Sequence, residues 1–229
     1  MATKPEQARL GVKAPELQIS EWAQGPAIRF EQLRGRVILV EVFQLNCPGC
    51  FLYALPQAIA LHQSYAKLGL TVLGLATAFE DFDKNTLENL IALTTSGRLV
   101  GETFRALEAR SLTEQDCWLN RLPFPVAMDQ LVPAEQPVNE DNVERFIQAK
   151  IPDFRHQPIT FQHRIREQIK SYLQKLEYHA QSFELFDLQG TPSQLLIDKL
   201  GILRACRFGE FPDLESQIQG LLAEPESVV

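Results

Sequence analysis

Two cysteines separated by two residues, Cys47-Pro-Gly-Cys50, are the strongest chemical signal in the sequence. They follow a run of apolar residues and precede a helical pattern, so we expect Cys47 at the N-terminus of a helix. Unpaired N–H groups and the positive end of the helix dipole stabilise a thiolate there. The pKa of Cys47 should therefore fall below the usual value of about 8.5. Cys50, one helical turn later, can attack a mixed disulfide on Cys47, so the pattern predicts thiol–disulfide exchange.

Two other interpretations of this motif remain open. The cysteines could be neighbours in the core by chance, although Pro48-Gly49 is a poor helix filler without a further reason. They could also be half of a zinc site, which would need a second cysteine pair or a close histidine pair. Cys117, Cys206 and the 4 histidines are dispersed along the chain. We therefore expect no metal and no cofactor, and we expect Cys117 and Cys206 to be small buried fillers rather than resolving cysteines.

Composition narrows the class of protein. The 229 residues are 45% hydrophobic and 22% charged, which fits a globular protein of one large domain, or one domain with a large insertion. A formal charge of −7 without a basic cluster argues against a nucleic-acid partner. The uncharged stretch 42–66 contains too many polar and helix-breaking residues for a membrane span. Because the first ten residues carry no apolar segment, we expect no secretory signal and a cytoplasmic location.

The elements around the cysteines follow an α/β pattern. Val37–Phe43 is an almost continuous apolar run, typical of a buried central strand. We predict a helix over 48–67, kinked at Pro56, and a second strand at 70–76, which together form a βαβ crossover with parallel pairing. Further strands are expected at 27–30 and, as a hairpin, at 194–198 and 202–208, before a last helix at 213–222.

The middle of the chain has a more helical pattern. Helices are expected at 85–95, 101–109 and 113–120, the last opening with a capping-box arrangement, and a short strand at 123–129. A loop-rich stretch at 130–160 surrounds one helix at 141–149. The longest helix, 161–183, carries an apolar stripe that packs on a core or, alternatively, forms a dimer. We therefore expect residues 96–185 to be a mainly helical insertion packed on a domain made of 1–95 and 186–229.

Four segments resemble, in this order, the redoxin branch of the thioredoxin-like superfamily. This branch includes the alkyl hydroperoxide reductase/thiol-specific antioxidant proteins and the cytochrome-maturation thioredoxins. The segments are Gly11-x-x-Ala14-Pro15-x-Leu17, Leu33-Arg-Gly35 leading into 37–43, Cys47-Pro-Gly-Cys50, and Gly190-Thr-Pro192 before the hairpin. They span a little over half the chain. The resemblance implies a thioredoxin-like α/β fold, with a central mixed sheet flanked by helices and a helical insertion before the cis-proline.

The resemblance also implies roles for individual residues. Cys47 would attack and Cys50 would resolve, while Pro192 would be a cis-proline beside them. The backbone of Thr191 would pair with an extended substrate, with Pro48 and Gly49 next to it. The partners would be a protein or small-molecule disulfide and an upstream thiol reductant.

Glu41 lies where thioredoxins keep a buried Asp. Desolvation should raise its pKa and suit it to exchange a proton with Cys50. Alternatively, Glu41 is paired with a Lys or Arg.

Several features depart from the family pattern and leave other functions open. Asn46 replaces the Trp that usually precedes the first cysteine, and the order Pro-Gly replaces Gly-Pro. A peroxidase of this branch would carry a Thr three residues before its cysteine and an upstream Pro, but Gln44 and Val40 stand at these positions. A non-catalytic or metal-handling redoxin is the third alternative.

The uncharged segment 44–54 predicts an apolar docking surface made by Leu45, Phe51 and Leu52. The competing expectation is that this segment is buried beneath the insertion.

Overall fold

The computed structural model describes residues 7–135, 137–151 and 153–225. These residues divide into two compact units. Residues 132–179 form one unit, and the described residues on both sides of that segment form the other, which contains Cys47 and Cys50. This division differs from the expected insertion at 96–185, because residues 96–131 and 180–185 belong to the larger unit. That the inserted unit packs on the larger one stays a prediction.

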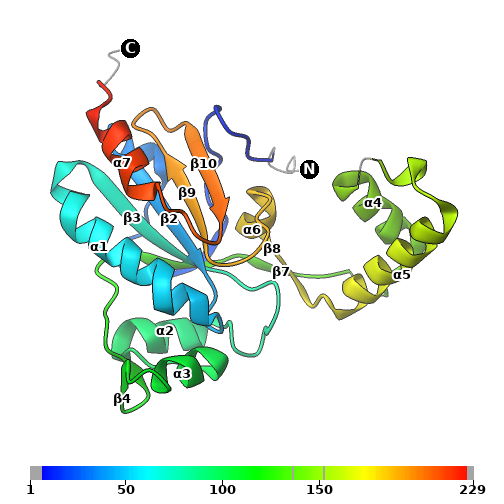
Figure 1. Cartoon of the computed structure of the whole chain (residues 1–229), viewed down its shortest axis with the longest axis horizontal. Coiled ribbons are helices and arrows are strands. Elements are labelled where there is room, and N and C mark those ends of the chain that lie inside the picture. Colours follow the sequence, from blue (N-terminus) through cyan, green and yellow to red (C-terminus); the bar gives the residue numbers. More distant parts are fainter. Residues whose placement is uncertain (1–6, 136, 152, 226–229) are drawn as a thin grey trace. The chain divides into compact units, whose positions relative to one another are not determined.

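A mixed sheet forms the centre of the larger unit (Figure 1). Its six strands run in the order β1 (Ile19–Gln24), β6 (Val126–Asp129), β3 (Leu70–Ala76), β2 (Val37–Phe43), β9 (Ser193–Ile197), β10 (Leu203–Phe208). Strand β2 pairs parallel with β3 and antiparallel with β9, and β6 pairs parallel with β3. The predicted fold class, a central mixed sheet flanked by helices, is confirmed.

The central strand β2 is buried on both faces, which explains its nearly continuous apolar sequence. Leu39 and Phe43 point into the core that contains the helices after the cysteines. Val40 and Val42 point into the core on the opposite face. Since side chains alternate along a strand, Glu41 shares the face of Leu39 and Phe43.

Helices cover both faces of this sheet. On the face of Phe43 lie α1 (Leu55–Tyr65), α2 (Leu87–Ser96), α3 (Gly101–Glu108) and α7 (Leu214–Ala223). Figure 1 shows α1 and α7 lying across this face. The short helix α6 (Gln181–Leu185) packs on the opposite face through Leu185.

The helix after Cys47 begins with a widened turn. Pro48 and Gly49 are helical, and Cys50–Ala54 form a π-helical turn that leads into α1. The N–H of Leu55 bonds the carbonyl of Cys50, five residues back. Pro56 has no N–H to donate, and in a regular helix its ring would crowd the carbonyl four residues earlier. The kink predicted at Pro56 therefore takes the form of a π turn, and such turns occur often at functional sites.

The predicted helix at 113–120 is wrong. This segment is a hairpin of β4 (Thr113–Glu114) and β5 (Cys117–Trp118). Gln115 and Asp116 both have a positive φ, 49° and 64°, which is the signature of a two-residue type I′ turn. The capping-box pattern thus marks a turn. The ring of Trp118 packs edge-on against Phe51 at 5.0 Å between centroids, so the hairpin covers the helix that follows Cys47.

The predicted strand at 27–30 is also wrong. Phe30–Leu33 form a 3-10 turn, and the edge strand of the sheet is β1, at Ile19–Gln24. This strand is half-exposed or exposed throughout, so its sequence lacks the apolar run of a central strand.

The described part of the smaller unit contains the α-helices α4 (Glu140–Lys150) and α5 (Ile159–Lys175), with a 3-10 turn at Phe154–His156 between them. Val143 and Ile147 of α4 pack against Ile169 of α5. The apolar stripe of the long helix thus contributes to a small core within its own unit, in which Ile169 is buried and Ile165 and Leu173 are partly buried, whereas Tyr172 is 48% exposed. The helix ends at Lys175 rather than near residue 183, because the chain continues into β8 (Tyr178–Ala180), which pairs with β7 (Leu131–Pro133).

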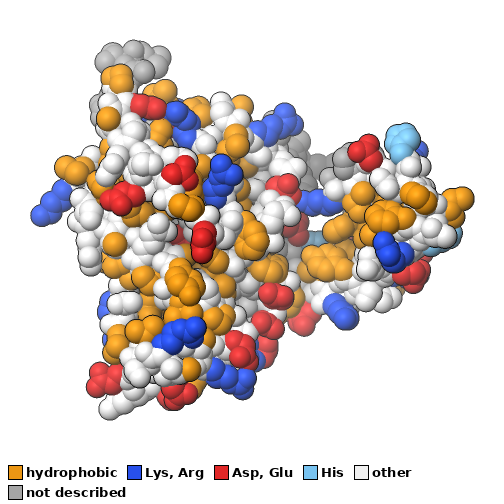
Figure 2. Space-filling model, viewed as in Figure 1, with side chains coloured by type: hydrophobic (Ala, Val, Ile, Leu, Met, Phe, Trp, Pro, Cys, Tyr) orange, Lys and Arg blue, Asp and Glu red, His pale blue; other side chains and the backbone are white. Residues whose placement is uncertain are grey.

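Charged side chains of both signs are interspersed over the face of the larger unit that Figure 2 displays. Among the described residues, no helix is both long enough and apolar enough to cross a membrane.

Candidate active site

Cys47 and Cys50 lie just beyond the carboxyl end of β2, where the chain enters the helix. Their Sγ atoms are 2.8 Å apart, and the Cys50 thiol donates a hydrogen bond to Cys47. Cys47 is half-buried, whereas Cys50 is fully buried. One sulfur is thus accessible and the other stands directly behind it.

This geometry separates the acidities of the two thiols. The pKa of Cys47 is lowered to about 6, chiefly by the hydrogen bond from the Cys50 thiol. Hydrogen bonds from Thr191 and from the backbone N–H groups of Gly49 and Cys50 add to the effect, while partial burial opposes it. The pKa of Cys50 is raised well above its usual value, first by burial and then by its hydrogen bond to Cys47. At neutral pH Cys47 is therefore the thiolate and Cys50 the thiol.

Thr191 and Pro192 reach this site from the other end of the chain. Their peptide bond is cis, as the resemblance implies. The Thr191 carbonyl oxygen lies 3.5 Å from Cys47 Sγ, and the Thr191 hydroxyl donates to Gln44 Oε1 at 3.1 Å. A Cβ added to Gly49 would lie 3.9 Å from Pro192 Cδ, an ordinary contact distance, so Gly49 lies directly beside the proline ring.

Glu41 lies in β2 on the face directed toward the cysteines and is buried. Its hydrogen-bond donor is the amide of Gln194, whose Nε2 lies 3.0 Å from Oε1 and 3.3 Å from Oε2 of the carboxyl group. The partner of Glu41 is therefore a neutral amide and not the Lys or Arg of the alternative prediction. The pKa of Glu41 is raised well above its usual value, because burial outweighs the Gln194 hydrogen bond, and the charge of Cys47 raises it further.

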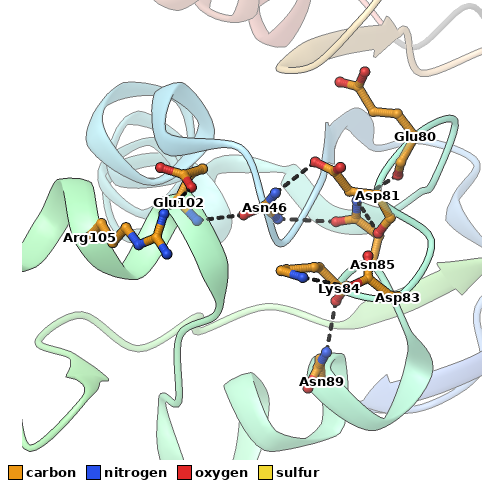
Figure 3. Close-up of polar contacts among 9 residues, drawn as sticks. All are labelled: Asn46, Glu80, Asp81, Asp83, Lys84, Asn85, Asn89, Glu102 and Arg105. Carbon is orange, nitrogen blue, oxygen red and sulfur yellow. Dashed lines mark hydrogen bonds and ion pairs between the residues drawn. The ribbon is translucent and has the colours of Figure 1, made fainter.

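Asn46, which precedes Cys47, connects three segments (Figure 3). Its Nδ2 donates to Asp81 at 2.7 Å, and its Oδ1 accepts from the N–H of Glu102 at 2.7 Å. Its own N–H donates to Asn85 Oδ1 at 3.1 Å. Asn46 therefore holds the loop before Cys47 to the loop after β3 and to the first turn of α3. A Trp could not make this pair of side-chain hydrogen bonds, since its indole has one donor and no acceptor.

The prediction of an apolar docking surface is wrong for two of its three residues. Leu45 and Phe51 are buried, and Phe51 lies beneath Trp118. Leu52 is half-buried, and the neighbouring Tyr53 is 68% exposed. The segment lacks charges largely because it is part of the core. Residues 96–131 of the larger unit cover segment 44–54, which agrees in part with the competing prediction that this segment is buried beneath the insertion.

The two remaining cysteines are free thiols. Cys117 and Cys206 are half-buried rather than buried, and burial raises the pKa of Cys206. Within the described ranges, no group of three or more His, Cys, Asp or Glu side chains is placed to hold a metal ion. The sequence analysis missed several contributors to the site, among them Gln194 beside Glu41 and Asp81, Asn85 and Glu102 around Asn46. Gln194 carried a signal, since it is the one amide in an apolar strand.

Comparisons with known proteins identify the fold through solved structures alone. A scan of protein-family models finds no match to the sequence, and neither does a search of curated proteins. Among solved structures, a thioredoxin-like superfamily protein matches with a TM-score of 0.57 and 27% identity, over 93% of this chain and 97% of that one. A thiol-disulfide isomerase from Corynebacterium glutamicum matches with a TM-score of 0.56 and 26% identity, over 95% and 98%. A thioredoxin-like protein in the oxidized form matches in fold, with a TM-score of 0.50 and 15% identity, over 95% and 96%. The fold is thioredoxin-like.

Proposed function

We propose that this protein is a thiol-disulfide oxidoreductase that exchanges electrons with a protein or small-molecule disulfide through Cys47 and Cys50. The observation that carries the proposal is the buried Cys50 thiol donating to the accessible Cys47 sulfur at 2.8 Å. The likeness to a thiol-disulfide isomerase at 26% identity supports the same class of reaction.

The reaction proceeds in two exchanges. The Cys47 thiolate attacks one sulfur of the substrate disulfide, the substrate S–S bond breaks, and the departing thiolate takes a proton from water. Cys50 then loses its proton and attacks Cys47 Sγ. The mixed disulfide breaks, a Cys47–Cys50 disulfide forms, and the substrate leaves with two more electrons. An upstream thiol reductant restores both thiols by the reverse exchanges.

The surrounding groups have supporting roles in this proposal. Glu41 accepts the Cys50 proton, which it can do because its raised pKa brings it closer to that of a thiol. The backbone of Thr191, beside Pro192, pairs with an extended substrate in the manner of strand addition. Pro48 and Gly49 form the adjoining part of the binding surface.

Trapping of mixed disulfides tests the assignment of the two cysteines. In the Cys50→Ser variant the first exchange can occur but the second cannot, so partner proteins should accumulate as mixed disulfides on Cys47. The Cys47→Ser variant should trap none, because its remaining thiol is buried and has a raised pKa. Equal trapping by both variants would overturn the assignment.

Peroxide consumption separates this proposal from a peroxidase. The wild-type protein should reduce a protein disulfide with a thiol reductant far faster than it consumes hydrogen peroxide under the same conditions. Faster consumption of peroxide would make the peroxidase the better description.

The direction of electron transfer is tested by the reduction potential of the Cys47–Cys50 couple. A potential of about −270 mV would identify a reductase and one of about −120 mV an oxidant. A cytoplasmic location is retained as part of the proposal.

A further inference from the structure

The Gln194 side chain has an unusual environment. It lies in β9 directly opposite Glu41 of β2 in the antiparallel register, and it is buried. Its Nε2 donates to both oxygens of Glu41, but its Oε1 is buried without a hydrogen-bond partner. A buried acceptor without a donor costs free energy, so this oxygen calls for an explanation.

The protonation state of Glu41 explains why the Gln194 oxygen has no partner. An ionised carboxylate only accepts hydrogen bonds, so it uses the Gln194 NH₂ group and leaves Oε1 idle. A protonated carboxyl group carries an O–H donor, which needs an acceptor. A half-turn of the Gln194 amide exchanges its oxygen and nitrogen, which brings Oε1 to the place of Nε2, about 3 Å from Glu41.

We propose that Gln194 is a positioning residue that holds Glu41 in both of its protonation states, with the amide turning over as the proton arrives or leaves. This inference rests on the proposed function. During the second exchange, the proton of the Cys50 thiol passes to the Glu41 carboxylate, and the Cys50 thiolate attacks Cys47 Sγ. The substrate sulfur departs with the electron pair of the broken bond. Gln194 Oε1 then accepts a hydrogen bond from the new O–H group of Glu41.

An amide suits this position because it contains a donor and an acceptor on one rotatable group. An apolar side chain would leave both states of Glu41 without a partner, and a Lys or Arg would hold Glu41 permanently ionised. The charge of Cys47 raises the pKa of Glu41, and the charge of Glu41 in turn raises the pKa of Cys50, so the carboxyl group senses the groups whose protons are exchanged.

The test measures the rate of the second exchange against pH. Wild-type and variant proteins are loaded on Cys47 with a small chromophoric thiol, and its release is followed in each. Gln194→Met keeps the size of the side chain but removes both amide groups. Both protonation states of Glu41 lose their partner, but the hydrogen bond to the ionised form is the stronger one, so the pH midpoint should rise by about one pH unit and release at neutral pH should slow about tenfold.

Two further variants show whether the effect passes through Glu41. Glu41→Gln should abolish the pH midpoint, and adding Gln194→Met to it should change the rate little further. Leu195→Met, on the opposite face of the same strand, is the matched control for the strand's packing and should leave the midpoint unchanged. In infrared difference spectra, the carboxyl band of Glu41 should shift in Gln194→Met but not in the control.

The outcomes distinguish this inference from the proposed function. Failure of the wild-type protein to release the thiol would refute the function itself. If wild type releases the thiol and Gln194→Met keeps its midpoint, only the role of Gln194 is overturned. An equal slowing by Gln194→Met with and without Glu41 would assign Gln194 to packing and would also overturn the inference.

Discussion

Gly101 should be intolerant of even one added methyl group, because it makes room for Asn46. Its φ of +52° is left-handed, and a Cβ there would lie 2.2 Å from Asn46 Oδ1 and 2.8 Å from Lys84 Cδ. The end of Lys84 can move, but Asn46 Oδ1 is held by the N–H of Glu102. In Gly101→Ala, Asn46 must therefore turn away and lose its hydrogen bonds to Glu102 and Asp81.

The expected loss of stability in Gly101→Ala has two parts. A left-handed Ala costs roughly 1–2 kcal/mol relative to Gly. Two hydrogen bonds at about 1 kcal/mol each add roughly 2 kcal/mol. Gly101→Ala should thus lower the free energy of unfolding by about 3–4 kcal/mol. Gly201 is the matched control, since its φ is +81° and a Cβ there would meet nothing within 4 Å. Gly201→Ala should therefore cost only the conformational part.

Equilibrium unfolding in urea measures both variants, and alkylation of Cys47 against pH adds a functional readout. Displacing Asn46 loosens the residue before Cys47 relative to the Cys50 thiol and the helix N–H groups. The pKa of Cys47, about 6 in the native protein, should therefore rise in Gly101→Ala and not in Gly201→Ala. With Asn46→Ala in place, adding Gly101→Ala should cost no more than Gly201→Ala does. Equal costs for the two glycine variants in the wild-type background would refute the reasoning.

Three further perturbations test other parts of the structure. Cys50→Ala should raise the pKa of Cys47 from about 6 toward its ordinary value, because the largest stabilising contact of the thiolate is lost; an unchanged alkylation profile would contradict this. Burial raises the pKa of Asp129 from 3.8 to about 6, so the folded state holds this proton more tightly than the unfolded state. That stabilisation is complete below pH 3.8 and is lost as pH rises through 6. The stability of wild type relative to Asp129→Asn should therefore fall by about 2 kcal/mol between pH 4 and pH 7, and a constant difference would count against it. Trp118→Ala should lower the free energy of unfolding by about 3–5 kcal/mol through its contact with Phe51, whereas a loss below about 1 kcal/mol would show that the hairpin is not part of this core.

Local patterns in the sequence determined the elements that carry the two cysteines. The apolar run 37–43, the helix after Cys47 and the strand at 70–76 all occur where their patterns predict them. These patterns are informative because a strand buried on both faces and a helix on a core need apolar residues at fixed periods. The same local information misled at 113–120, where a capping box and a type I′ turn begin with similar residues and only φ distinguishes them.

Contacts between distant segments were decided by the tertiary structure. Thr191 reaches Cys47 across 144 residues, and Gln194 meets Glu41 across 153. The sequence showed that Glu41 is an unusual acid in an apolar strand, but its partner depends on the register between β2 and β9. Likewise, the need for glycine at position 101 arises from Asn46, which lies in another segment. Periodicity reports which face of an element is buried, whereas the partner on that face follows only when the strands have been ordered and aligned.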